Sequence, residues 1–171
     1  MKYFFVFSVS ILLSLKSFAA MDMFLKINLI PGESVDATHK EWIDVLAFTD
    51  GATAKIVPNS SPTVFTNEFS FTIYIDKSLN PLRRVLFVGT HITNIQFDMR
   101  KAGNSQLYEQ VYMENVVVTS ITGGLDGASD RGTINVSFCP AKFRYTYYIT
   151  APNGTQTTNL FGWDVQGNIT W

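Results

Sequence analysis

Apolar and polar residues alternate along several stretches of this chain, with the period of two that places side chains on opposite faces of a strand. Phe69–Ile75 carries an aromatic or aliphatic side chain at every second position, and Ile95–Met99 and Phe143–Ile149 do the same. This pattern predicts a strand in each stretch. Further, less regular strand candidates are Phe24–Leu29, Ile43–Thr49, Leu107–Met113, Val116–Ile121, Thr133–Phe138 and Phe161–Ile169.

Turn-forming residues separate most of these candidates, among them Pro31-Gly32, Asp50-Gly51, Gly123-Gly124 and Asn153-Gly154. Many short strands in one small domain favour a closed β-barrel or a sandwich, since both bury one face of every strand. We therefore expect a mainly β protein.

One segment has the signature of a helix. Asn80 can cap its N-terminus, Pro81 suits the first helical position, and Gly89 can end the helix in the left-handed conformation. Between them, Arg83 and Arg84 are expected to be solvated or to bridge to a neighbour. The side chains expected to face inward are Leu82, Val85, Leu86 and Phe87.

The segment Val116-Val117-Val118 interrupts the alternation, because its apolar side chains point to both faces of a strand. A strand that is apolar on both faces needs a cover on each. Either the short helix lies over this strand or a partner subunit covers it.

The N-terminus has the pattern of an export signal. Lys2 precedes the uncharged, mostly apolar run Tyr3–Leu15, and small residues at Ser17 and Ala19 suit a signal peptidase. Cleavage is expected after Ala19 or Ala20. The alternatives are a true start at Met21 or an uncleaved anchor. In each case residues 1–20 are a signal peptide or extension, and residues 21–171 form the folded domain.

Composition narrows the possible partners. The chain is 46% hydrophobic and 14% aromatic, so a packed core is expected. Its 13 basic and 14 acidic side chains nearly balance, and this argues against a nucleic-acid partner. We expect no membrane partner for the mature form. Cys139 is the single cysteine, so no intramolecular disulfide can form, and we expect its thiol to be buried and inert.

No motif for catalysis or metal binding is found. His39 and His91 lie in different segments, without metal-ligand spacing. Gly123–Gly127 lacks the lysine and hydroxyl of a phosphate-binding loop and is interpreted as a hairpin loop. The acidic residues of the 33–44 segment lack calcium-loop spacing and are interpreted as solvated charges. We expect no enzyme activity, no cofactor and no metal. These acidic residues are Glu33, Asp36, Glu41 and Asp44.

An ordered set of short segments resembles the haemolysin-coregulated protein (Hcp) family of type VI secretion. No segment is decisive alone, but together they span Met21–Trp171. They are Met23–Ile27, Pro31–Ser34 with Asp36 and His39, Ile43–Leu46, Phe71–Thr72, Tyr74–Ser78, Arg100–Gly103, Asp130-Arg131, Asn135-Val136 with Phe138, and Gly162–Asp164 with Asn168.

The resemblance implies a β-barrel of two packed antiparallel sheets with one short flanking helix, assembled as a homo-hexameric ring. In this family, rings stack into a tube that a contracting sheath expels, with effectors carried in or on it. Effectors and the tip and sheath components are the implied partners. The loop after the family's second strand reaches the next ring; the matching stretch, Asp50–Pro62, is shorter, which puts stable stacking in doubt. Thr49 matches a lumen-lining position, although it also suits an ordinary strand end.

The N-terminal pattern departs from this family, whose members begin at a methionine matching Met21 and leave the cytoplasm through the secretion machine. One hypothesis is a tube subunit, cytoplasmic before type VI export. The alternative is an Hcp-like ring, exported by the Sec pathway, that works outside a tube as a binding protein or effector. An enzyme fused to the tube is not expected, because the chain stops where the family usually ends. Gly162 and Trp163 are expected to be structural, through close backbone approach beside a large buried ring.

Overall fold

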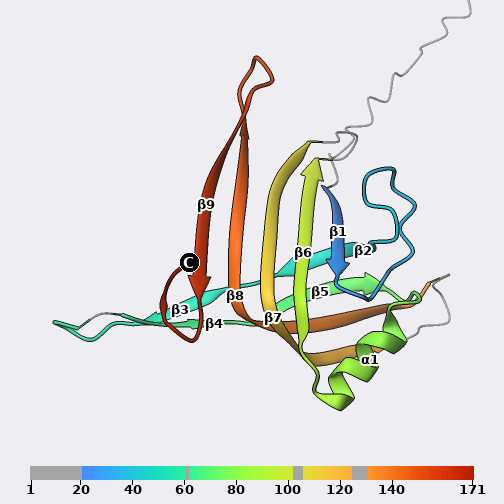
Figure 1. Ribbon diagram of the computed structural model, residues 1–171, viewed down its shortest axis with the longest axis horizontal. Coiled ribbons are helices and arrows are strands. Elements are labelled where there is room, and N and C mark those ends of the chain that lie inside the picture. Colours follow the sequence, from blue (N-terminus) through green and yellow to red (C-terminus); the bar gives the residue numbers. More distant parts are fainter. Residues whose placement is uncertain (1–20, 61, 102–105, 125–130) are drawn as a thin grey trace, which may run out of the picture.

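A computed structural model describes residues 21–60, 62–101, 106–124 and 131–171 of the chain as antiparallel strands with one short helix (Figure 1). This confirms the predicted fold class. The elements are β1 (Met21–Ile27), β2 (Ile43–Thr49), β3 (Ala52–Lys55), β4 (Thr63–Thr66), β5 (Phe69–Tyr74), α1 (Leu79–Val88), β6 (Ile92–Lys101), β7 (Leu107–Gly124), β8 (Thr133–Thr150), β9 (Gln156–Asp164) and β10 (Ile169–Thr170).

Six strands close into a barrel. The sheet runs in the order β10-β9-β8-β5-β2-β1-β6-β7, and β7 pairs again with β8. The ring of pairings is therefore β8-β5-β2-β1-β6-β7-β8, which leaves no free edge in the barrel. Strands β9 and β10 continue the sheet beyond β8, and β3 and β4 form a separate hairpin that projects from one side (Figure 1).

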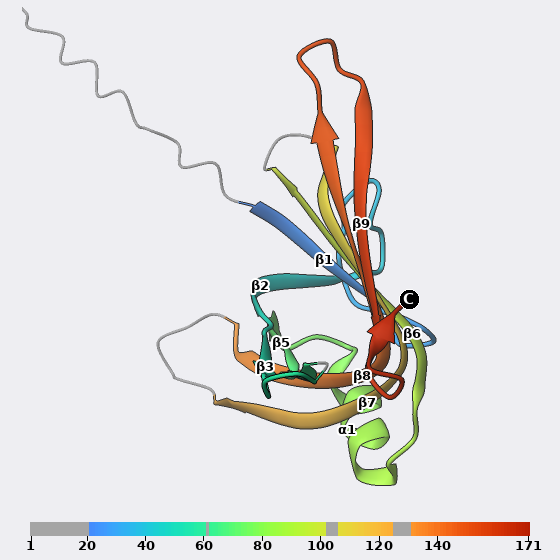
Figure 2. The same ribbon diagram turned by 90° about the vertical axis from the view of Figure 1, so that its left-hand side faces the viewer.

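The strands β7 and β8 are longer than the sequence indicated, since each joins two candidates that we had separated. Both bend sharply at mid-length (Figure 2). The bend is accommodated by Asn115, which has a φ of 50°, by a register shift between Val118 and Ser120, and by Pro140 opposite Val116. Such irregularities turn a strand while the pairing continues on either side. One strand, β8, thereby pairs with β5 through its first part and with β9 through its second.

Three other boundaries differ from the predictions. The first strand ends at Ile27, because the chain turns there. The Phe161–Ile169 candidate splits into β9 and β10 around a turn in which Gly167 N–H donates to Asp164 Oδ1 at 2.8 Å. The Asp50–Pro62 stretch contains β3 and leads into β4, so it is part of a hairpin and not simply a loop.

Helix α1 begins two residues earlier than predicted, with Ser78 in place of Asn80 at its N-cap. The Ser78 hydroxyl donates to Asp76 Oδ1 at 2.5 Å instead of capping the helix. Gly89 ends the helix in the left-handed conformation, with a φ of 71°, as predicted. Leu82 is fully buried, but Phe87 is 85% exposed, so its predicted inward position is wrong.

The helix packs on β7, the strand that contains Val116–Val118. Val116 and Val118 are buried in the same core cluster as Leu79 and Leu82, whereas Val117 is half-buried. The face with Val116 and Val118 is therefore covered within the subunit, whereas the face with Val117 is only partly covered.

Large aromatic side chains fill the barrel. Phe71 and Phe97 are fully buried with ring centroids 4.9 Å apart, and Phe48 lies within 4.9 Å of both rings. Burying each such ring contributes roughly 1.5–3 kcal/mol to stability. The barrel interior is therefore a packed core, and any binding surface must lie outside it.

Candidate functional site

A polar network fastens the loop between β1 and β2 to the barrel. Arg100 on β6 donates from Nη2 to the Asp36 carboxylate and from Nη1 to Thr38 Oγ1, the latter at 2.9 Å. Its guanidinium also lies over the Phe24 ring, 4.8 Å from the centroid. A single buried cation thus holds β1, β6 and the loop together.

His39 adds a second attachment. Its ring stacks on Phe24 with centroids 4.4 Å apart, and its Nε2 lies 3.0 Å from Asp98 Oδ2 on β6. Asp98 also accepts hydrogen bonds from the amides of Gln96 and Gln110. Each of these polar side chains has a partner inside the group, as the low dielectric of a buried site favours. Arg100 Nε is the exception among the guanidinium nitrogens described, since it is buried without a hydrogen bond and lies 3.6 Å from Asp22 Oδ2.

The network explains the electrostatics of Asp36. Burial by itself would raise the pKa of its carboxyl group, but hydrogen bonds from Arg100, Thr38 and His39 outweigh that effect. They hold the pKa well below the ordinary range. The prediction that Asp36 is a solvated loop charge is therefore wrong. Its neighbours Glu41 and Glu33 do form exposed ion pairs, with Lys77 and Arg131.

The sequence analysis named three members of this network, Asp36, His39 and Arg100, but did not join them. Arg100 entered only as part of the family resemblance, His39 also as a histidine without metal-ligand spacing, and Asp36 also as an independent loop charge. The missing link is the antiparallel pairing of β1 with β6, which sets Phe24 opposite Asp98. Nothing in the local pattern indicates that pairing.

The other predicted positions are dispersed. His91 is exposed directly before β6, with its Nδ1 2.6 Å from Asn115 Oδ1. It lies ~20 Å along the strand from Asp98, the residue that His39 contacts. Thr49 is exposed at the end of β2, opposite Ser70. Outside the described residues lie Ala19, Ala20 and residues 125–127 of the glycine-rich segment. No group of three or more His, Cys, Asp or Glu side chains suited to a metal ion is found among the residues described.

Cys139 contradicts its prediction, because the structure places it on the surface. Partial burial, with a smaller contribution from the charge of Glu68, raises the pKa of its thiol. The thiol form is thereby favoured over the reactive thiolate.

Gly162 and Trp163 occupy the strand β9. A Cβ on Gly162 would lie 2.2 Å from the carbonyl oxygen of Trp171, so no side chain fits there. Trp163 is half-buried opposite Phe143 and packs against the core. Its Nε1 is buried, and no hydrogen-bond partner for it exists among the described atoms.

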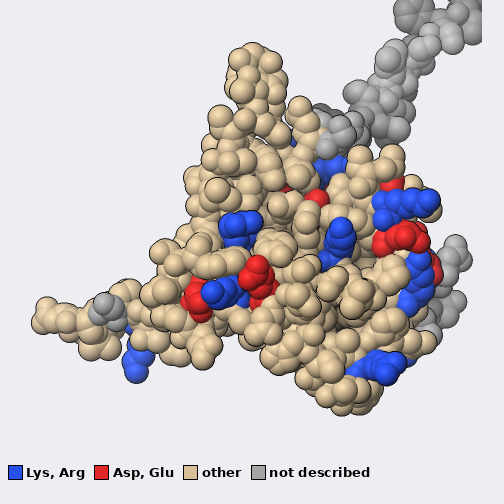
Figure 3. Space-filling model, viewed as in Figure 1, with Lys and Arg blue, Asp and Glu red and all other residues tan. Residues whose placement is uncertain are grey.

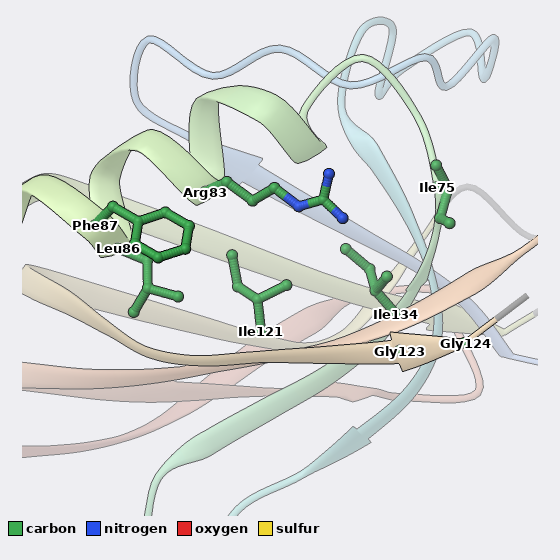
Figure 4. Close-up of a pocket in the computed structure, with 8 residues that line it drawn as sticks. All are labelled: Ile75, Arg83, Leu86, Phe87, Ile121, Gly123, Gly124 and Ile134. Carbon is green, nitrogen blue, oxygen red and sulfur yellow. The ribbon is translucent and has the colours of Figure 1, made fainter.

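Two hollows on the surface are mainly apolar. A groove of about 300 Å³ lies between α1 and the end of β7, with the Arg83 side chain reaching over Ile121 and Ile134 (Figure 4). An aromatic pocket of about 270 Å³ lies at the base of the β3–β4 hairpin. The rings that line this aromatic pocket belong to Phe69, Phe143, Tyr145, Phe161 and Trp163.

Exposed apolar side chains occur on both flanks of the molecule. On the hairpin flank they include Ile56, Val57, Phe65, Leu160 and Phe161; on the flank with α1 and the β1–β2 loop they include Leu29, Val35, Phe87 and Val88. Others, among them Met21, Leu46, Ile149 and Ile169, lie elsewhere in the fold. Figure 3 shows basic and acidic side chains interspersed on the face in view, without a broad field of one sign. Such a surface suits contacts with proteins.

Comparison with known proteins identifies the family. The model of the family described as "Type VI secretion system effector, Hcp" matches residues 24–147. A protein named hcp1 from Pseudomonas aeruginosa is 33% identical over 159 residues, which cover 88% of this chain and 98% of the relative. This chain belongs to the Hcp family.

Solved structures agree with the assignment. Hcp1 from Salmonella typhimurium is 26% identical, with a TM-score of 0.73 over 89% of this chain and 99% of its own. A type VI secretion system effector from Yersinia pestis is 29% identical, with a TM-score of 0.69 over 84% of this chain and 100% of its own. In the described part of this Hcp chain, no helix has the length and apolar character to cross a membrane.

Proposed function

We propose that this Hcp protein is a structural subunit of the type VI secretion tube, assembled as a ring of six. Membership of the Hcp family supports the role in type VI secretion. The observation that carries the assembly is the presence of two unlike sets of exposed apolar side chains. The elements that carry them lie on opposite sides of the molecule (Figure 1). A ring closed by rotation needs two different complementary faces on each subunit.

The closed barrel constrains how subunits can join. Because the six barrel strands leave no free edge, neighbours cannot add strands to the barrel itself. The contacts are then left to side-chain surfaces, to the projecting β3–β4 hairpin and to the outer edge of β9 and β10. The hairpin tip carries the exposed Ile56 and Val57, and such apolar side chains favour contact with another protein.

The tube role includes cargo. Rings that stack would enclose a lumen, and Thr49 is our candidate for a side chain that lines it. Effector proteins would bind there, and the tube tip and sheath would be the further partners. Bond chemistry has no part in this function, which consists of ring closure, stacking and recognition.

Light scattering after size exclusion tests the ring directly. Purified protein of residues 21–171 is expected to have six times the subunit mass at micromolar concentration. A stable monomer at tens of micromolar would contradict the ring and leave a single binding barrel. Electron microscopy of the same sample then distinguishes stacked tubes from separate rings.

The alternative function is a ring exported by the Sec pathway that works outside a tube. The apolar run Tyr3–Leu15, followed by Ser17 and Ala19, favours it. Assembly cannot separate the two functions, because both use the same folded domain. The compartment in which the protein is found separates them.

A further inference from the structure

Leu29 combines three properties that are seldom found together in a leucine. It is the third residue of the turn Ile27–Ile30, in which Ile30 N–H donates to Ile27 O at 3.1 Å. Its φ is 64°, in the left-handed region that glycine or asparagine normally occupies in such turns. Its side chain is 91% exposed. A strained and exposed apolar side chain points to a contact made outside the subunit.

The turn that carries Leu29 is held firmly against the barrel. Asn28 N–H donates to Asn94 O on β6 at 3.2 Å, and Ile27 and Ile30 form a bridge across the turn. The loop that follows is fastened by the Asp36–Arg100 and His39–Asp98 contacts. A side chain presented on such a support loses little conformational freedom when it binds.

The aromatic pocket on the opposite flank has a matching character. It is open to the surface, and its volume of about 270 Å³ accommodates one aliphatic side chain. Five aromatic rings line it, and Ala52 of the hairpin lies at its wall. Figure 1 shows the β1–β2 loop on one side of the molecule and β3, β4 and β9 on the other. Leu29 therefore cannot reach the pocket of its own subunit.

The charges around the two features are complementary. Leu29 shares a shallow hollow with Lys26 and Lys40, and the one carboxylate in that hollow, Glu41, is paired with Lys77 at 3.7 Å. The aromatic pocket instead has Asp50 in its wall. Asp50 accepts a hydrogen bond from the Tyr145 hydroxyl and lies close enough to Glu109 to raise the pKa of that carboxyl, after the larger effect of burial. The basic side chains beside Leu29 and the carboxylate in the pocket wall favour a head-to-tail approach at these two sites.

We propose that Leu29 of one subunit inserts into the aromatic pocket of the next copy, with Lys26 and Lys40 facing Asp50. Each subunit then presents Leu29 on one flank and a pocket on the other, which is the arrangement that a closed ring requires. The inference rests on the proposed ring of six and adds the side chains that join neighbouring subunits.

The variant Leu29→Gly distinguishes a role of Leu29 in assembly from a role in the stability of the fold. The protein tested is residues 21–171, which hold every described element. Glycine adopts a positive φ without strain, so the fold keeps its stability or gains some. The concentration at which half of the rings dissociate is expected to rise at least tenfold, measured by light scattering on dilution. Val35→Ala is the matched control, since Val35 is an apolar side chain that is 95% exposed on the same flank. If Leu29 makes the specific contact, the Val35→Ala rings should be weakened much less than the Leu29→Gly rings.

Cysteine cross-linking tests the pairing of the two sites. In a Cys139→Ser background, Leu29→Cys combined with Ala52→Cys is expected to yield a disulfide-linked ladder of up to six subunits after mild oxidation. Phe87→Cys combined with Ala52→Cys is the control, and it should yield no ladder.

The outcomes are distinguishable. Rings of Leu29→Gly as tight as those of the wild type, or equal ladders from both cysteine pairs, overturn the Leu29 contact while the ring stands. A wild-type protein that stays monomeric overturns the ring and the contact together.

Discussion

The Arg100 guanidinium donates a hydrogen bond to the Asp36 carboxylate, joining two residues 64 positions apart in the chain. The side chain of Arg100 is 9% exposed and that of Asp36 is 21% exposed, so the pair is largely removed from water. This contact ties the β1–β2 loop to the barrel wall and fixes the surface on which Leu29 lies.

Removal of one partner of this pair is expected to lower the stability of the folded protein. Asp36→Asn leaves the Arg100 charge poorly compensated in a mostly buried site, so the free energy of unfolding should fall by about 2–4 kcal/mol. Denaturant unfolding monitored by tryptophan fluorescence measures it. Lys77→Met is the control, because its pair with Glu41 is exposed and should contribute less than about 1 kcal/mol. Equal losses in both variants would contradict a stabilising role for the contact between Asp36 and Arg100.

The same contact makes stability depend on pH. The pKa of Asp36 is lower in the folded protein than its ordinary value of about 3.9, so the folded state favours the ionised form. Its stabilising contribution is complete well above pH 4 and is lost as the pH falls below about 4. Unfolding measured between pH 3 and 6 should show a weaker acid dependence in Asp36→Asn than in the wild type. Parallel curves would mean that other carboxyl groups cause the acid dependence.

Gly162 should not tolerate a side chain. The added Cβ of Gly162→Ala would meet the backbone oxygen of Trp171, which must move, and we expect a loss of about 1–3 kcal/mol. Gly124→Ala is a suitable control, since a Cβ there meets nothing within 4 Å. Thermal unfolding measures the stability of both variants. Equal stability would show that β10 and the C-terminal residue can move aside at little energetic cost.

Trp163 is expected to stabilise the β9 extension. Trp163→Ala in a full core would cost ~3–5 kcal/mol, and because this ring is half-buried we expect about 2–3 kcal/mol. Trp163→Phe keeps much of the apolar contact and should recover at least half of the loss in the same denaturant assay. A loss below about 1 kcal/mol in the alanine variant would mean that the ring contributes little packing.

The route of export is a separate prediction. We expect the full-length chain to be recognised by the Sec machinery and cut near Ala19, giving a periplasmic product that starts at Ala20 or Met21. N-terminal sequencing of protein from separated cytoplasm and periplasm measures this. If the protein is found only in the cytoplasm, with an uncut N-terminus that starts at Met1, Sec export is excluded. A periplasmic pool that persists after deletion of the secretion sheath would exclude the ordinary tube role.

The local pattern was sufficient for the class of the fold and for much of its secondary structure. Alternation at Phe69–Ile75 predicted β5, because burial of one strand face imposes a period of two whatever the neighbouring strand. Ile43–Thr49 matches β2 at both ends. Gly89 ended the helix as expected, since a left-handed terminus is a local requirement of the backbone.

Only the tertiary structure decided which strands continue and which distant groups meet. The alternation breaks between Met113 and Val116 and between Phe138 and Phe143, so the sequence predicted separate strands there, yet pairing with neighbouring strands continues β7 and β8 through both breaks. From the sequence, Asp36 was interpreted as a solvated charge. The pairing of β1 with β6 instead places Arg100 beside it. The positive φ and the exposed side chain of Leu29 likewise could not be predicted from the sequence. Periodicity is a local consequence of burial, whereas register, closure and long-range pairing depend on the packing of the whole chain.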